Sequence, residues 1–75
     1  MWQPSLAIFL ENYSPVQSIA ESTDQYTTKE IQRMLEEHTG VQVDLNELYV
    51  ALLDANFHYV GQGIEMSWLF KKIEV

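Results

Sequence analysis

The chain has 75 residues, of which 47% are hydrophobic and 12% aromatic, and this composition is too apolar for a disordered tail. Its 11 acidic and 4 basic residues give a formal net charge of −7, which disfavours contact with a polyanion. The chain contains no cysteine, which excludes disulfides and thiolate metal sites. No apolar run approaches the roughly 18–20 residues of a membrane span, so we expect one cytoplasmic domain comprising residues 1–75.

Residues 4–13 are expected to form the first helix. Pro4 suits the first turn of a helix, because the N–H that it lacks would have no partner there. Large apolar residues follow at helical spacing, and Ser14-Pro15 then ends the helix. The polar segment that follows is expected to be a loop. Residues 1–25 are thus predicted to be an N-terminal extension made of a helix and a loop.

The second predicted helix, residues 28–39, has signals at both ends. Thr27 and Glu30 have the spacing of a capping box, in which each side chain binds the other residue's backbone N–H. Gly40 is placed for the left-handed conformation that ends many helices. The third predicted helix, residues 45–55, follows after a short turn.

The C-terminal residues are expected to form a β-hairpin with strands at 57–60 and 64–73, joined by a glycine-rich turn. The alternation along the second strand directs Trp68 and Phe70 toward the core and Leu69 to the opposite face. Three helices with a short helix–helix turn, followed by a hairpin, predict a mainly helical α+β fold of the winged-helix type.

Several capping and core positions carry a resemblance to a known group of domains. They are Tyr26 to Ile31 (YTTKEI), Leu35, Val43-x-Leu45 and Leu52-x-x-x-Asn56-Phe57. This pattern resembles winged helix-turn-helix domains of phage and plasmid mobile elements, including primase–helicase-associated and uncharacterised bacterial domains, and covers about residues 26–73. The resemblance implies the winged-helix fold and, as a function, a DNA-binding regulator of transcription or replication.

The charge of the third predicted helix argues against nucleic acid. A helix-turn-helix protein reads the major groove with this helix, but here its outward face carries Glu47 and Asp54 and no base. Since phosphate contacts supply most of the nonspecific affinity, two acids on that face oppose binding. DNA binding is therefore the alternative hypothesis. Its candidate residues are Lys29, Arg33, Asn46, Lys71 and Lys72, which would form one small patch if the two pairs of cations lie together.

Catalytic and metal sites are not predicted. His38 and His58 lie far apart in the sequence, and neither has a second ligand at the spacing of a zinc site. The glycine-rich turn of the predicted hairpin is shorter than a phosphate-binding loop and has no lysine nearby. We expect no enzymatic activity, no cofactor and no metal.

The favoured hypothesis is an acidic module that acts through protein–protein contacts, as a homodimer or as an adaptor for another protein. An apolar patch with an acidic rim is typical of such surfaces. The candidate interface residues are Trp2, Leu6, Ile8, Phe9, Leu10, Val50 and Leu69. The competing interpretation is that the first helix completes the core of a monomer.

Overall fold

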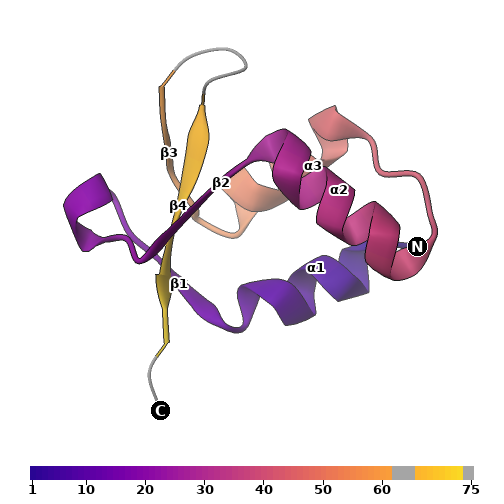
Figure 1. Ribbon diagram of the computed structural model, residues 1–75, viewed down its shortest axis with the longest axis horizontal. Helices are drawn as coiled ribbons and strands as arrows, with labels where there is room; N and C mark the ends of the chain where they lie inside the picture. Colours follow the sequence, from indigo (N-terminus) through magenta and orange to yellow (C-terminus); the bar gives the residue numbers. More distant parts are fainter. Residues whose placement is uncertain (62–65, 74–75) are drawn as a thin grey trace.

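The structure is a computed structural model that describes residues 1–61 and 66–73 (Figure 1). Within these residues it is an α+β domain with three α-helices and a small antiparallel sheet. The elements in chain order are α1 (Gln3–Leu10), β1 (Tyr13–Pro15), the 3-10 helix η1 (Ile19–Glu21), β2 (Asp24–Thr27), α2 (Thr28–Thr39), α3 (Leu45–Asp54), β3 (Tyr59–Val60) and β4 (Ser67–Lys72).

Strand β4 is the centre of the sheet. Tyr26 of β2 and Tyr59 of β3 both pair with Trp68, so these two strands lie on opposite edges of β4. Pro15 of β1 pairs with Phe70, which also pairs with β2, and β1 therefore lies on the same edge as β3. The predicted pairing of the two C-terminal strands is confirmed by β3 and β4. Part of the predicted hairpin, residues 62–65, lies outside the described residues.

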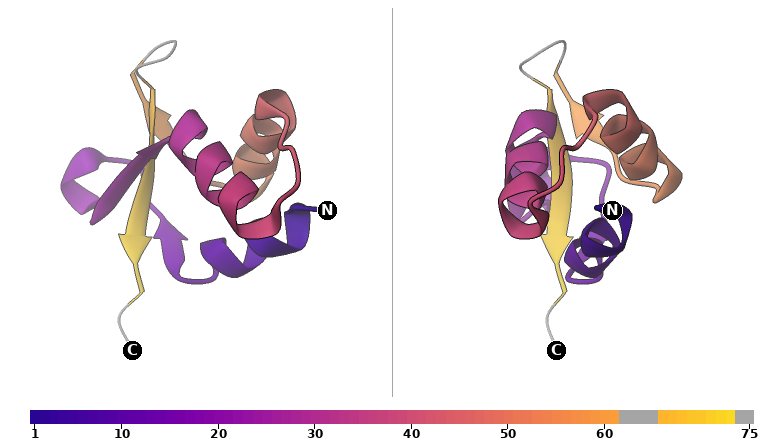
Figure 2. Two further views of the ribbon diagram at one scale, coloured as in Figure 1. Left: turned by 45° about the vertical axis from the view of Figure 1, so that its right-hand side comes forward. Right: turned by 90° about the vertical axis from the view of Figure 1, so that its right-hand side faces the viewer.

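The connection between β1 and β2, residues 16–23, crosses β4. Because the two strands lie on opposite edges, this segment must pass over one face of the sheet, and Figures 1 and 2 show η1 on the side opposite the three helices. Thr23 fixes the end of the crossing. Its N–H donates to the Phe70 carbonyl (2.8 Å), and its hydroxyl accepts from the Lys72 N–H (2.7 Å).

This crossing explains why one expectation about Leu69 is wrong. The side chain does alternate away from Trp68 and Phe70, as predicted, but it is 0% exposed and not available as an interface. The face of β4 away from the helices is covered by residues 16–23, which were predicted as part of a helix-and-loop extension and not as a cover for the sheet.

The core fills the space between the helices and the sheet. Its central aromatic residue is Phe70, whose ring centroid lies 5.9 Å from Phe9, 5.3 Å from Tyr13 and 5.6 Å from Tyr26. The indole N–H of Trp68 donates to the Thr28 hydroxyl (2.8 Å), so the buried ring has its polar atom paired. The buried cluster comprises Trp2, Leu6, Ile31, Leu35, Val43, Leu48, Leu52, Phe57, Trp68 and Phe70.

The N-terminal helix belongs to this core. Leu6 is therefore not accessible as an interface residue, and Trp2 is buried except where it lines a surface groove. Trp2 and Leu6 are each 4% exposed and pack with the residues of α2, α3 and β4. Phe9 and Leu10 are half-buried against the same cluster. Residues 1–25 therefore contribute to the core instead of extending from it.

The first helix is also shorter than the predicted 4–13. It ends at Leu10, where the Asn12 side-chain amide donates to the carbonyl of Ile8 (3.2 Å) and satisfies a group that has no helical partner. Tyr13 begins β1 and pairs with Lys72. Pairing with β4, which is distant in the sequence, outweighs the local helical periodicity at Tyr13.

The caps predicted for α2 form, and the N-terminus of α3 is capped by an aspartate. Thr27 Oγ1 accepts from the Glu30 N–H (3.1 Å), and a Glu30 carboxylate oxygen accepts from the Thr27 N–H (2.9 Å). Asp44 accepts from the backbone N–H three residues later (3.0 Å). Gly40 has the predicted left-handed conformation, with φ of 71°, and Asn56 adopts the same conformation after α3, with φ of 68°. These caps set where α3 begins and ends, and therefore which of its residues face outward.

Candidate functional site

Two of the candidate interface residues remain accessible. Ile8 is 64% exposed on α1, and Val50 is 51% exposed on α3. Successive helical residues are rotated by about 100°, so Ile8 lies well away from the buried Leu6. Val50 lies on the outward face of α3, between Glu47 and Asp54, and all three side chains are exposed.

A groove runs between α3 and the N-terminus of α1, with a volume of about 410 Å³. We call it the α1–α3 groove. It is lined by Trp2, Gln3, Asn46, Glu47, Val50, Ala51 and Asp54. Its apolar side chains come from both helices, and its charged groups are two carboxylates on α3. The groove thus combines apolar side chains with an acidic rim. Trp2 forms part of its wall and is not an exposed residue of a flat patch.

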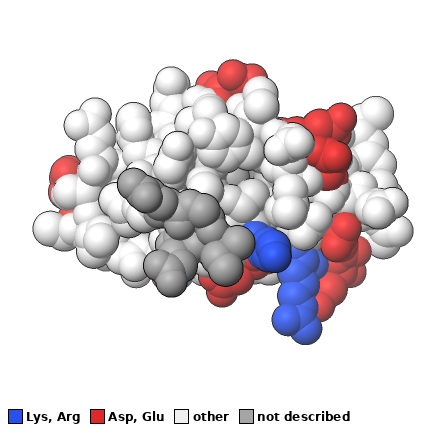
Figure 3. All heavy atoms as spheres, turned by 90° about the horizontal axis from the view of Figure 1, so that it is seen from above, with Lys and Arg blue, Asp and Glu red and all other residues white. Residues whose placement is uncertain are grey.

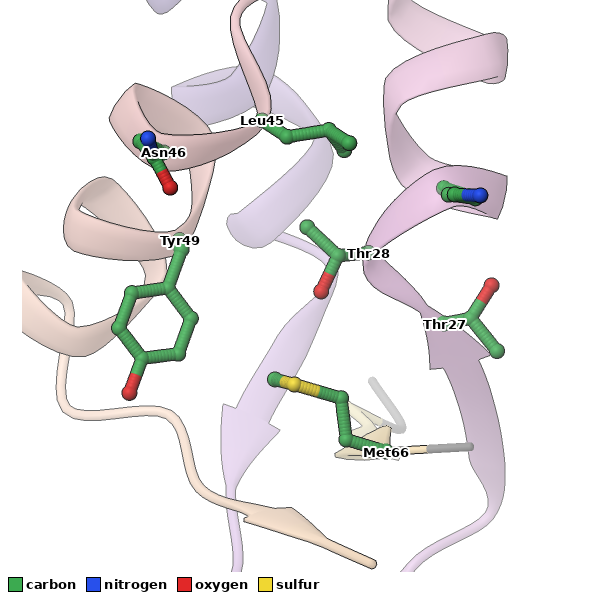
Figure 4. A pocket seen from close by; sticks show the side chains of 7 residues that line it. Thr27, Thr28, Leu45, Asn46, Tyr49 and Met66 are labelled. Carbon is green, nitrogen blue, oxygen red and sulfur yellow. The ribbon is translucent and has the colours of Figure 1, made fainter. Parts of the chain in front are cut away.

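A second groove, of about 320 Å³, lies on the other side of α3, and we call it the α2–α3 groove. Figure 4 shows Leu45 pointing from α3 toward α2 and Thr28 pointing from α2 toward α3, with Tyr49 and Met66 beside them. The lining residues are Thr27, Thr28, Lys29, Leu45, Asn46, Tyr49 and Met66. Lys29 is the cation among these lining residues, and the structure brings it to the same groove as Asn46.

A hydrogen bond near the α2–α3 groove ties α3 to the hairpin. The hydroxyls of Tyr49 and Tyr59 are 3.1 Å apart, and the Tyr49 ring lies edge-on to Trp68 at 5.7 Å. The hydrogen bond to Tyr59, with a smaller contribution from burial, raises the pKa of Tyr49. The neutral form of the Tyr49 phenol is therefore favoured.

The condition for a single patch of cations, that the two pairs lie together, is not met. Lys29 follows Thr27, which pairs with Ser67 at the start of β4, whereas Lys71 and Lys72 lie at the end of that strand. The five steps from Ser67 to Lys72 span roughly 16 Å of extended strand. The two pairs of cations therefore lie at opposite ends of the sheet.

The remaining cation of α2 is already engaged with an acid. Arg33 Nε lies 3.2 Å from a carboxylate oxygen of Glu37 one turn later, and both side chains are well exposed. On the face seen in Figure 3, Lys and Arg atoms gather in one place with Asp and Glu atoms beside them, and further acidic atoms lie elsewhere on that face. The charge available for phosphates is correspondingly small.

The described ranges 1–61 and 66–73 contain no group of three His, Cys, Asp or Glu side chains that could hold a metal ion. Both histidines are exposed. In the same part of the chain, no helix has the length and apolar character needed to cross a membrane.

No protein-family model, curated protein or solved structure matches this chain. The functional argument therefore rests on the two grooves. Sequence reasoning identified the outward residues of α3 but missed the other walls, including Gln3, Thr28, Tyr49 and Met66. Those walls depend on how α1 and α2 pack beside α3, and helical periodicity carries no signal of that packing.

Proposed function

We propose that this protein is a non-enzymatic winged-helix module that acts through protein–protein contacts. The order of β2, α2, α3, β3 and β4 after the N-terminal helix supports the winged-helix arrangement, with β1 and η1 inserted between α1 and β2. The position of β2 and β3 on opposite edges of β4 also supports it. In that arrangement α3 occupies the position of the recognition helix. The function then depends on what the outward face of α3 can bind.

One observation carries the proposal: the outward face of α3 combines the exposed Val50 with two carboxylates. Glu47 and Asp54 flank Val50 and line the same groove, and the residues that line this groove include no cation. A polyanion is repelled by such a face. Protein interfaces, in contrast, commonly combine an apolar centre with a polar rim.

DNA binding of the mobile-element regulator type is the second candidate function. It is favoured by the α2–α3 groove, where Lys29 and Asn46 line one hollow beside the N-terminus of α2. A single lysine supplies little of the phosphate attraction that DNA binding needs. Arg33 is paired with Glu37, and the C-terminal lysines lie at the other end of the sheet. Protein binding is therefore the stronger proposal.

Affinity purification from the source cells with three tagged proteins tests this proposal. The wild-type chain is compared with Val50→Glu and with Ile19→Glu, a control that places the same charge at a residue of similar exposure, 55%, on η1. We expect a bound protein, either a second copy or another chain, that the wild type and Ile19→Glu retain and Val50→Glu loses. Equal recovery with all three proteins would contradict a role for α3, and recovery of nucleic acid that depends on Lys29 would favour the second candidate.

A further inference from the structure

We infer that the α1–α3 groove binds a basic amphipathic segment of a partner protein, an inference that rests on the proposed function and names the partner's chemistry. The groove offers apolar surface mainly from Val50, which is 51% exposed, and from Ala51, beside the largely buried Trp2. Glu47 and Asp54 lie along its α3 wall. A segment that buries an apolar side chain here brings its neighbouring residues against the carboxylates. Cations at those positions complement the groove, and acids are excluded from it.

The spacing of the acids defines the match further. Glu47 and Asp54 are seven residues apart, which is about two helical turns or roughly 10 Å along α3, and Val50 lies between them. A partner segment with two Lys or Arg side chains about 10 Å apart, and an apolar residue between them, contacts all three. Two cations at helical positions i and i+7 have this separation.

Asp54 supplies a second, independent observation. It is the last residue of α3, where the negative end of the helix dipole disfavours a carboxylate, and the last turn of α3 contains no base. Among the described residues, the one ion pair joins Arg33 and Glu37, so Asp54 has no described cation as a partner. A cation from a bound segment relieves this unfavourable position. Local departures of this kind are expected where function imposes them.

A second copy of this chain is a weaker occupant. Its exposed Lys71, Lys72 and Ile73 include two bases and an apolar residue, but they belong to a different surface from the groove. Docking one surface into another makes a head-to-tail contact that closes only as a ring and otherwise grows into a filament. A basic segment of a different protein binds without that consequence.

The test uses a phage-displayed library of random peptides selected against the full chain. The most enriched peptide is then synthesised and titrated into the isotope-labelled protein. We expect enriched peptides to have a net positive charge with an apolar residue between two cations. On addition of the peptide, the backbone amide signals of the protein should shift at residues 2–3 and 46–54.

Charge-reversed variants make the test specific. Glu47→Lys with Asp54→Lys should weaken binding of the synthetic peptide at least ~10-fold, which corresponds to about 1.4 kcal/mol. Glu11→Lys with Glu37→Lys changes the net charge equally at exposed positions outside the groove and should leave the affinity within about twofold. Asp54→Asn, a milder substitution, should give a smaller loss and covers the case in which the double variant unfolds.

The outcomes separate the inference from the function on which it rests. Enriched peptides that are neutral or acidic, or that map to another surface, would overturn the basic-segment inference while leaving protein binding intact. A library that yields no binding peptide would contradict both. If the amide signals of the groove residues shift when the concentration of the protein is raised without peptide, the groove binds a second copy of the chain. That result would overturn the inference of a different partner.

Discussion

Helix α3 has a groove on each side, and the two grooves differ in charge although both include Asn46. The α1–α3 groove has Glu47 and Asp54 on its wall, whereas the α2–α3 groove has Lys29. Both contain apolar side chains and both depend on the same helix. Under the proposed function, the ligand of α3 depends on the few charged side chains around it and not on its place in the fold alone.

Each groove is joined to the core by one residue of its wall. Trp2 is at once a wall of the α1–α3 groove and a member of the buried cluster. Thr28 likewise lines the α2–α3 groove and contacts the core, because its hydroxyl accepts a hydrogen bond from the indole N–H of Trp68. Substitutions at these two residues therefore test whether both grooves are built on the core.

Trp2→Ala is expected to have the largest effect, a loss of about 3–5 kcal/mol in the free energy of unfolding, because it removes a buried indole. Urea denaturation followed by circular dichroism measures the loss. Val50→Ala, on the exposed face of the same groove, should change stability by no more than about 0.5 kcal/mol. A loss below about 1 kcal/mol for Trp2→Ala would mean that α1 is not part of the core.

Thr28→Val should cost less, about 1–3 kcal/mol, because it leaves the Trp68 N–H without its acceptor while nearly conserving volume. Thr28→Ser keeps the hydroxyl and serves as the matched control. The same denaturation experiment compares the two. If Thr28→Val loses no stability, the hydrogen bond between Trp68 and Thr28 contributes nothing to the free energy of unfolding.

Tyr13, which packs against the core, is expected to make the stability of the protein depend on pH in the alkaline range. Burial, followed by the neighbouring Tyr26 phenol, raises the pKa of Tyr13 to about 12. The unfolded chain ionises this phenol near pH 10. The stability contributed by neutral Tyr13 is therefore complete below pH 10 and is lost as the pH rises toward 12.

This small effect is measured by denaturation of the wild type and Tyr13→Phe between pH 8 and about 12, with ultraviolet absorbance reporting phenolate. The wild type should lose more stability than Tyr13→Phe over this interval. Parallel curves for the two proteins would contradict a raised pKa for Tyr13.

The sequence predicts those parts of the fold that depend on near neighbours. The capping pairs at Thr27 and Asp44 lie within three residues of their partners, and α2 was predicted with its observed bounds. Strands β1 and β2 were missed because their partner residues in β4 lie 40 or more residues away along the chain. No local pattern signals such pairing. The burial of Leu69 was missed for the same reason, since the segment that covers it is held by those two strands.

The candidate site was predictable to the same extent. The periodicity of α3 identified Glu47, Val50 and Asp54 as outward residues, and their exposure confirms this. The grooves themselves were not predictable, because they form where α1 and α2 pack beside α3. The division of the cations between the two ends of the sheet also depends on the register of β4 with β1 and β2.

The central claim is that the outward face of α3 is a protein-binding surface and not a nucleic-acid surface. Titration of fluorescently labelled duplex DNA at roughly 20–50 mM salt tests it most directly, because any phosphate-driven affinity is largest there. We predict no binding by the wild-type protein. Binding that weakens steeply with added salt, and that Lys29→Ala reduces, would contradict the claim and move the functional site to the α2–α3 groove.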